Sequence, residues 1–237
     1  MSFISARERT RIRTRCRRSR AAMLAMALAI VVCCGCSDNS EPEPKSTPAP
    51  DLCAGTLDTA AVAALRRLAD TDQFIEDSGG GKHGQPRLFS LPWTAAHLHD
   101  PGIRLAECGI DKAKHDGTYW GLNLDFTAAS AVPTRDQIAN DFPVARYGRL
   151  TYFPTGETAY VQGDSIATLY FACRTRGNDR ETPYVRAGSI TNGHLEGDSK
   201  AKDHMAIVSS VSRRLAAELG CADEANLPTT VPNPEGS

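Results

Sequence analysis

Four cysteines within residues 52–221 constrain what this chain can fold into more than any other feature: Cys53, Cys108, Cys173 and Cys221. In an oxidising compartment, an even set of cysteines in a modest domain most simply forms two disulfides. A zinc site is the rival interpretation, but no pair has the two-residue spacing typical of structural zinc. The fold therefore depends on the compartment that the chain reaches.

The N-terminal segment predicts export. The first 35 residues hold eight arginines and one acid, Glu8, and an apolar run from Ala21 to Cys34 follows Arg20. A basic region, an apolar region and a small-residue site describe an export signal. The run is shorter than the roughly 20 apolar residues that cross a bilayer. An uncleaved single-pass anchor is the alternative, and both interpretations place residues 37–237 outside the cytoplasm because the positive charge stays inside.

The near-neutral charge of the whole chain is an average over two unlike parts. The chain has 27 Lys+Arg and 28 Asp+Glu, a net charge of −1. The 202 residues after Gly35 hold 19 bases and 27 acids, a net charge of −8. Because that part is acidic and its bases are scattered, we expect no nucleic-acid partner.

The Gly35-Cys36 junction resembles the lipobox of bacterial lipoproteins, in which an aliphatic residue, a small residue and Gly or Ala precede the Cys. The pattern departs at Cys33, where Leu or Val is usual. In that family the Cys thiol is acylated and becomes the new N-terminus. The resemblance implies a signal peptide over residues 1–35, lipidation of Cys36, and a lipid anchor on the outer face of the cytoplasmic membrane, since two or three acyl chains hold a protein firmly.

Composition divides the exported part into three segments. Residues 36–51 contain four prolines and are expected to form a disordered spacer, because they lack the apolar surface needed to fold. Residues 52–221 are expected to form a single domain. Residues 222–237 are expected to be a disordered tail, with three prolines from Leu227 onward.

Periodicity within residues 52–221 predicts an α+β fold with an antiparallel sheet between an N-terminal and a C-terminal helix. Asp58 can cap a helix that runs to about Leu68, and a second helix is expected from about Asp203 to Leu219, with Gly220 as its stop. The expected strands are Arg87–Leu91, Ile103–Ile110, Tyr119–Phe126, Gly148–Phe153, Thr158–Val161, Ile166–Cys173 and Tyr184–Ile190. In the third of these, Trp120 falls on the apolar face.

The cysteines suggest bonds between helix ends and strands. Two of them flank the predicted helices and two lie within or beside predicted strands. Three connectivities are compatible with the sequence, and this placement favours Cys53–Cys108 and Cys173–Cys221.

The cysteines and their neighbours also resemble a group of secreted actinobacterial lipoproteins of uncharacterised function. The resembling features are Cys53-Ala-Gly-Thr-Leu at the start of a helix, Cys108 before a Trp-bearing strand, Phe171-Ala-Cys173 at the end of another, and Leu219-Gly-Cys221. The resemblance implies export, lipidation and paired cysteines, and it carries no catalytic residues.

The sequence has none of the nucleophile-elbow, phosphate-loop, dinucleotide or zinc-protease motifs. The Gly79–Lys82 run is interpreted as a surface loop. His97, His99 and Asp100 could hold a metal with His83 or His115, but single surface histidines are far commoner, so no metal or cofactor is predicted.

Carboxylates and aromatic residues offer two further possibilities. Asp72, Glu76 and Asp77, or Asp136 and Asp141, could serve glycosidic chemistry only across a cleft. The side chains that could stack on a sugar or another ring are Trp93, Tyr119, Trp120, Tyr152, Tyr160 and Tyr170. Trp93 lies between turn signals and is the preferred candidate for an exposed ligand contact.

These observations predict a membrane-anchored, non-enzymatic lipoprotein that binds a protein, a cell-envelope component or a small ligand. Two alternatives remain open: an envelope hydrolase with a site assembled from dispersed residues, and a purely structural or accessory subunit.

Overall fold

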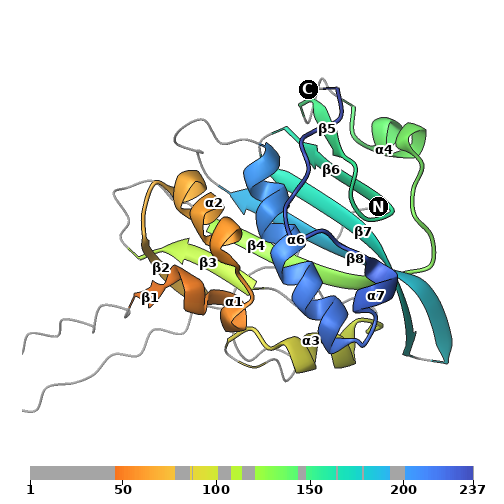
Figure 1. The fold of residues 1–237 in the computed structure, drawn as a ribbon, viewed down its shortest axis with the longest axis horizontal. Coiled ribbons are helices and arrows are strands. Elements are labelled where there is room, and N and C mark those ends of the chain that lie inside the picture. The colour runs from red at the N-terminus through yellow and green to blue at the C-terminus, as the bar shows by residue number, and fades with distance from the viewer. Residues whose placement is uncertain are drawn as a thin grey trace, which may run out of the picture. The chain divides into compact units, whose positions relative to one another are not determined.

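The structure, a computed structural model, describes residues 46–77, 86, 88–100, 108–113, 121–143, 148–163, 165–177, 179–192 and 201–236. Within these residues, eight strands form one antiparallel sheet in the order β1-β2-β3-β4-β8-β7-β6-β5 (Figure 1). The strands are β1 (Thr47–Pro48), β2 (Gln73–Asp77), β3 (Cys108–Lys112), β4 (Gly121–Ala129), β5 (Leu150–Phe153), β6 (Thr158–Gln162), β7 (Ile166–Gly177) and β8 (Arg180–Asn192). The helices are η1 (Ala49–Asp51), α1 (Leu52–Gly55), α2 (Thr59–Ala69), α3 (Leu91–His97), α4 (Arg135–Asp141), α6 (Ala201–Glu218) and α7 (Ala222–Ala225). The predicted α+β class is confirmed.

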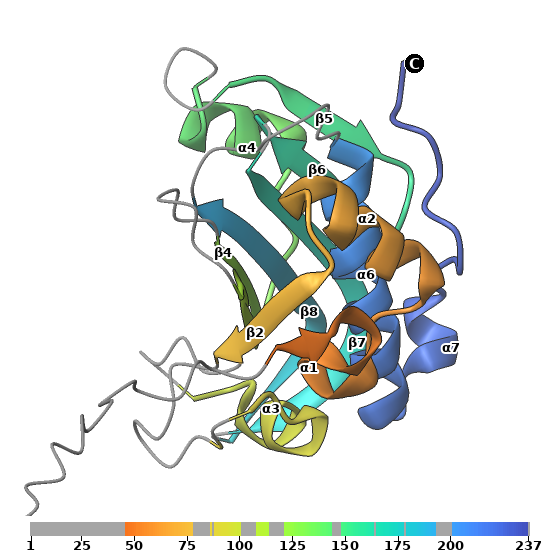
Figure 2. The ribbon, with the colours of Figure 1, turned by 90° about the vertical axis from the view of Figure 1, so that its left-hand side faces the viewer.

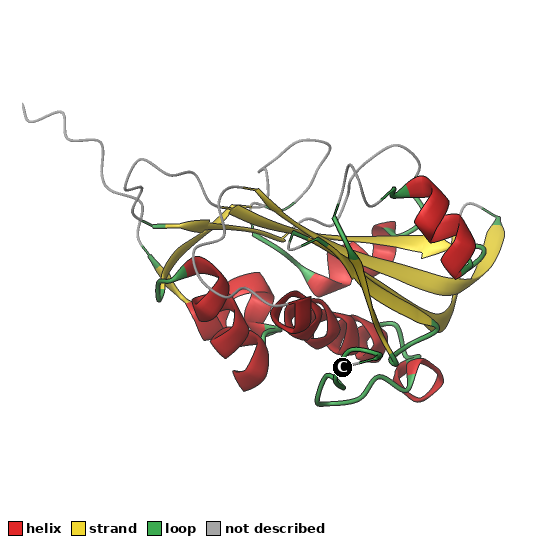
Figure 3. Ribbon diagram, turned by 90° about the horizontal axis from the view of Figure 1, so that it is seen from above, coloured by secondary structure: helices red, strands yellow, loops and turns green. Residues whose placement is uncertain are grey.

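Helices α2 and α6 cover one face of the sheet, and α4 lies on the other side (Figures 2 and 3). Strand alternation explains which face is covered, because successive side chains point to opposite sides. Leu122 and Leu124 of β4, and Leu169 and Phe171 of β7, are fully buried on the helix side. Both strands therefore turn an apolar face towards the helices.

The start of α2 is held by hydrogen bonds that the sequence suggested only in part. The Asp58 carboxylate accepts a hydrogen bond from the Ala61 N–H at 2.8 Å, which makes Asp58 the expected N-cap. The other carboxylate oxygen pairs with Arg213 of α6. The Ser210 hydroxyl accepts from the Asp58 N–H and donates to the Thr56 carbonyl. These bonds fix α2 against α6.

Both expected disulfides are present. Cys53 in α1 is bonded to Cys108 at the start of β3, with their Cα atoms 5.6 Å apart. Cys173 in β7 is bonded to Cys221, which follows α6, with their Cα atoms 5.3 Å apart. Each bond ties a helical segment to the sheet, so the predicted pairing of helix ends with strands is confirmed.

One predicted strand is wrong, and several short elements were not predicted. Ser90 ends the segment expected to be extended, because its hydroxyl accepts a hydrogen bond from the Trp93 N–H at 3.4 Å and caps α3. Pro92 lies in the first turn of α3, where its missing N–H costs nothing. Strand β2 and helix α4 are too short to show a hydrophobic period in the sequence. Contacts with the rest of the fold stabilise them.

Both domain boundaries also differ from the expectation. The spacer was expected to extend to residue 51, but β1 and η1 belong to the fold, and Ala49 is buried. The tail expected over residues 222–237 contains α7, and Val231 is buried against the rest of the domain. A proline-rich segment can become part of the fold when a few of its apolar side chains are buried against the core of the domain.

Several expectations lie outside the described residues: the signal peptide, Cys36, spacer residues 37–45, Gly79–Lys82, His83, His115, Tyr119 and Trp120. Among the residues that are described, no helix is long and apolar enough to cross a membrane.

Candidate ligand-binding cleft

The uncovered face of the sheet carries a row of polar and aromatic side chains. Strand register aligns Asp125 of β4 with Gly188 of β8, Thr168 of β7 and Tyr160 of β6. In the adjacent row, Arg186 of β8 is aligned with Tyr170 of β7. Directly paired residues point to the same side of a sheet, so these groups lie together opposite α2 and α6.

Helix α4 and the segment before it turn this face into a cleft of about 700 Å³. The helix is held by a capping box, in which the Gln137 N–H donates to the Thr134 hydroxyl and the Thr134 N–H donates to the Gln137 amide oxygen. Ile138 is buried and fixes the helix against the domain. The cleft is lined by Ala131, Val132, Pro133, Gln137, Ile138, Asn140, Asp141, Phe142, Tyr160, Ile166, Thr168, Tyr170 and Arg186. Its volume lies within the range of about 300–1,000 Å³ usual for small-ligand sites.

An ion pair forms part of the cleft floor. An Nη1 atom of Arg186 lies 2.5 Å from the Asp125 carboxylate, and about a third of each side chain is exposed. Gly188 leaves the room that this pair needs, since a Cβ there would lie 2.5 Å from Asp125 Oδ1 and 2.9 Å from Arg186 Nη2. The absence of a side chain at Gly188 therefore lets the pair lie across β8.

Two phenols border the ion pair, Tyr160 being buried and Tyr170 half-buried. Burial raises the pKa of Tyr170, and the nearby Arg186 guanidinium, which also hydrogen-bonds to it, opposes that effect. Burial likewise raises the pKa of Tyr160, against a hydrogen bond with Thr168. Burial disfavours the charge of Arg186, but the Asp125 carboxylate outweighs this and the pKa of Arg186 is raised. At neutral pH the floor thus holds one ion pair and two neutral hydroxyl groups.

The histidines and the tryptophan singled out in the sequence lie elsewhere. The Trp93 ring stacks on the His97 ring in α3, with centroids 4.1 Å apart, and neither residue lines the cleft. His99 is hydrogen-bonded through Nε2 to the Thr175 hydroxyl at 2.9 Å. Within the described part of the chain, no group of three His, Cys, Asp or Glu residues could hold a metal ion.

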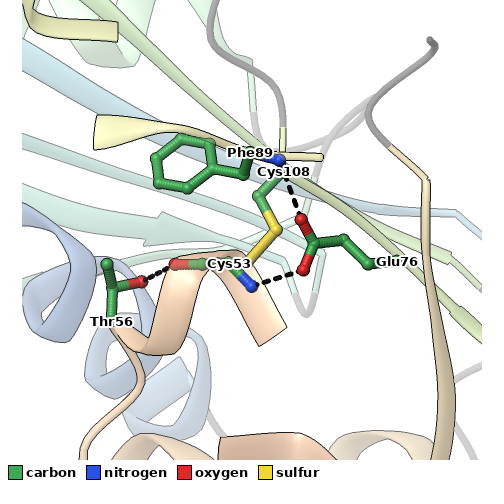
Figure 4. The surroundings of a disulfide bond; sticks show 5 residues. All are labelled: Cys53, Thr56, Glu76, Phe89 and Cys108. Carbon is green, nitrogen blue, oxygen red and sulfur yellow. Dashed lines mark hydrogen bonds between the residues drawn. A yellow bond between two sulfur atoms is a disulfide. The ribbon is translucent and has the colours of Figure 1, made fainter. Parts of the chain in front are cut away.

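The carboxylates named from the sequence are also separated. Glu76 uses both oxygens to bind backbone, accepting from the Cys53 N–H at 2.7 Å and the Phe89 N–H at 2.8 Å beside the first disulfide (Figure 4). Asp72 is exposed in the turn before β2, and Asp141 lines the cleft while Asp136 does not. The structure therefore does not bring the candidate acids into one site.

Besides a hollow of about 150 Å³ beside Arg135 and Glu235, the described residues line two other concavities. One of about 850 Å³ lies beside the turn end of the β7–β8 hairpin, where His99, Thr175 and Thr182 are hydrogen-bonded in a chain. One of about 280 Å³ lies between α2, α6 and the C-terminal segment, where Arg67 pairs with Asp203. In both, these central polar groups bind one another. The cleft beneath α4 alone among the three combines aromatic side chains with a polar floor.

Sequence reasoning found part of this cleft. Tyr160 and Tyr170 were named as residues able to stack on a ring. Arg186 and Gly188 were missed, because only the pairing of β4 with β8 brings them to Asp125. A single Arg and a single Gly in a predicted strand do not by themselves indicate a binding site.

Comparison with protein-family models, curated proteins and solved structures finds no match for this chain. The function of the candidate site is therefore inferred from the chemistry of its own residues.

Proposed function

We propose that this chain is an extracytoplasmic lipoprotein, anchored through Cys36 to the outer face of the cytoplasmic membrane, whose domain binds a small ligand in the cleft beneath α4. The cleft is the observation that carries the binding proposal, because it combines a suitable volume with convergent polar groups and an apolar wall. The N-terminal segment and the two disulfides support an extracytoplasmic location.

Binding is favoured over hydrolysis for a specific reason. Glycosidic hydrolysis needs two carboxyl groups about 5–10 Å apart across a cleft. Among the described lining residues, Asp141 is the one acid, and the nearby Asp125 carboxylate is bonded to Arg186. These groups are better suited to binding a ligand than to transferring protons to it.

The anchor is tested by metabolic labelling with radioactive palmitate. We expect label in the wild-type chain and none in a Cys36→Ala variant expressed at the same level. Equal labelling of the two chains would contradict the lipid anchor.

The binding role is tested by enrichment from an envelope extract. The purified wild-type chain and an Ala131→Trp variant, which places a large side chain at the cleft wall, are equilibrated with the same extract and separated from unbound small molecules. Mass spectrometry should find compounds retained by the wild type and depleted in the variant. Identical profiles would show that the cleft is not a small-ligand site.

A further inference from the structure

The charges in the cleft already compensate one another. Arg186 is the one base among its described lining residues, and the guanidinium is bound to Asp125 at 2.5 Å. Because the Asp125 carboxylate neutralises the guanidinium, an anionic ligand at Arg186 would meet no net positive charge and a nearby like charge. Asp141 adds a negative charge but is exposed, so water and salt weaken its attraction for a cation. The site is therefore matched to an uncharged ligand.

Apart from Arg186 and Asp141, the hydrogen-bonding groups of the cleft are neutral and suit a ligand with many hydroxyl groups. The Tyr170 hydroxyl lies near the Arg186 guanidinium, which opposes the effect of burial on its pKa, and arginine can only donate hydrogen bonds. The hydroxyl hydrogen of Tyr170 is therefore left for another acceptor. The Gln137 amide oxygen is used in the cap of α4, which leaves its NH₂ group as a donor. Thr168 and Asn140 add groups that both donate and accept.

Apolar side chains also line the cleft. Phe142 lies beside Tyr160, with ring centroids 6.4 Å apart and planes tilted by 49°. Val132, Pro133 and Ile166 extend the apolar wall. A pyranose ring has the matching surface, because its C–H groups form apolar faces while its hydroxyl groups project from the rim, and aromatic side chains supply such faces at little entropic cost.

We infer that the cleft binds a neutral carbohydrate, either as a free saccharide or as a segment of an envelope polysaccharide. This inference rests on the proposed binding function and narrows it to a ligand class. The sugar ring lies against Phe142 and the apolar wall, and its hydroxyl groups bind Tyr170, Thr168 and the amide of Gln137.

The test is saturation-transfer NMR on the purified full-length chain with a defined saccharide panel. The neutral probes are glucose, galactose, mannose and N-acetylglucosamine, together with cellobiose, maltose, chitobiose and the corresponding tetrasaccharides. Glucuronic acid and glucose 6-phosphate are the anionic probes and glucosamine is the cationic one. We expect saturation transfer to at least one neutral probe and weaker transfer to its charged analogue. Preference for tetrasaccharides over the shorter probes would identify a polysaccharide segment as the source, and equal binding of the shorter probes would identify a free saccharide.

The site is tested with two matched substitutions. Tyr170→Phe removes one hydroxyl group and keeps the ring, so the dissociation constant of the bound saccharide should rise about five-fold. Tyr184→Phe is the control, because Tyr184 lies half-buried on the same side of β8 and does not line the cleft. It should leave the dissociation constant unchanged, and both variants should keep the wild-type circular dichroism spectrum.

Three outcomes would overturn the inference: binding of the charged probes alone, binding of no saccharide, or equal affinity in the wild-type and Tyr170→Phe chains. The envelope-extract experiment separates these failures from failure of the proposed function. A cleft-dependent ligand that is not a carbohydrate would leave the binding role standing and refute only the ligand class.

Discussion

Glu76 shows how one side chain can hold three segments together. Its carboxylate joins β2 to the Cys53 N–H of α1 and to the Phe89 N–H before α3. A carboxylate can accept both bonds, whereas a glutamine amide has a single acceptor oxygen. The acid that the sequence offered as a catalytic candidate is thus a structural acceptor.

Glu76→Gln should therefore lower the free energy of unfolding by about 1–3 kcal/mol, because one backbone N–H loses its acceptor. Glu218→Gln is the matched control, since Glu218 is exposed at the end of α6 and should change stability little. Urea denaturation of both variants measures the difference. Equal midpoints would mean that the hydrogen bonds of Glu76 add nothing to stability.

The buried phenols of the cleft predict how stability depends on alkaline pH. Burial raises the pKa of Tyr160 and Tyr170 in the folded chain above their ordinary value of about 10. Below pH 10 both states keep the phenolic protons, so these groups add no pH dependence. Above it, the unfolded chain releases them first, so the free energy of unfolding must fall as pH rises towards the folded pKa.

Denaturation between pH 8 and 11 should show this fall, and a chain carrying both Tyr160→Phe and Tyr170→Phe should show a smaller one. Identical slopes in the two chains would contradict the burial of these hydroxyl groups.

Helices and strands differ in how far the sequence determines them. The predictions of α2, α6, β4 and β7 are confirmed because each has a full period of apolar residues, and α2 and α6 also have Asp58 and Gly220 at their ends. Strand β2 and helices α3 and α4 are short, and packing completes them. The cleft could not be predicted from the sequence either, because it depends on the register of β4 and β8 and on the position of α4.

The two disulfides should stabilise the domain by similar amounts. They close loops of 55 and 48 residues, and loop-closure entropy gives about 4 kcal/mol for each at 25 °C. We expect the Cys53→Ala/Cys108→Ala and Cys173→Ala/Cys221→Ala chains to lose comparable stability in urea denaturation. A loss below about 1 kcal/mol for either pair would show that its bond is dispensable.

The C-terminal segment closes an edge of the sheet. Val231 is buried, and the Glu235 N–H donates to the Tyr152 carbonyl of edge strand β5 at 2.9 Å. Arg135 pairs with Glu235 and lies 4.5 Å from the centre of the Tyr152 ring. This segment belongs to the domain although its composition is that of a tail.

Ending the chain after Asn226 should cost about 1–3 kcal/mol of stability, from lost apolar burial and hydrogen bonds. Val231→Ala separates the apolar part of this loss from the rest. A truncated chain with the wild-type melting temperature would mean that the segment does not stabilise the domain.

The molecule as a whole uses the two faces of its sheet differently. One face is covered by α2 and α6, with Leu124 and Phe171 buried beneath them. On the other face, Asp125, Arg186 and the two phenols form the floor of the cleft, and α4 completes it. Disulfides tie the helical layer to the sheet at Cys53 and Cys173, so the face that carries the cleft has a rigid support. The central claim is therefore that one face of the sheet forms the core and the other face binds the ligand.

Tyrosine-selective isotope labelling tests that claim most directly, because the chain has only six tyrosines and two of the described ones, Tyr160 and Tyr170, line the cleft. NMR spectra are recorded before and after addition of the small molecule that the wild-type chain enriches from an envelope extract. The resonances of Tyr160 and Tyr170 should shift, while that of Tyr184 should not. Unchanged Tyr160 and Tyr170 resonances in the presence of a bound ligand would place the binding site outside the cleft and contradict the account.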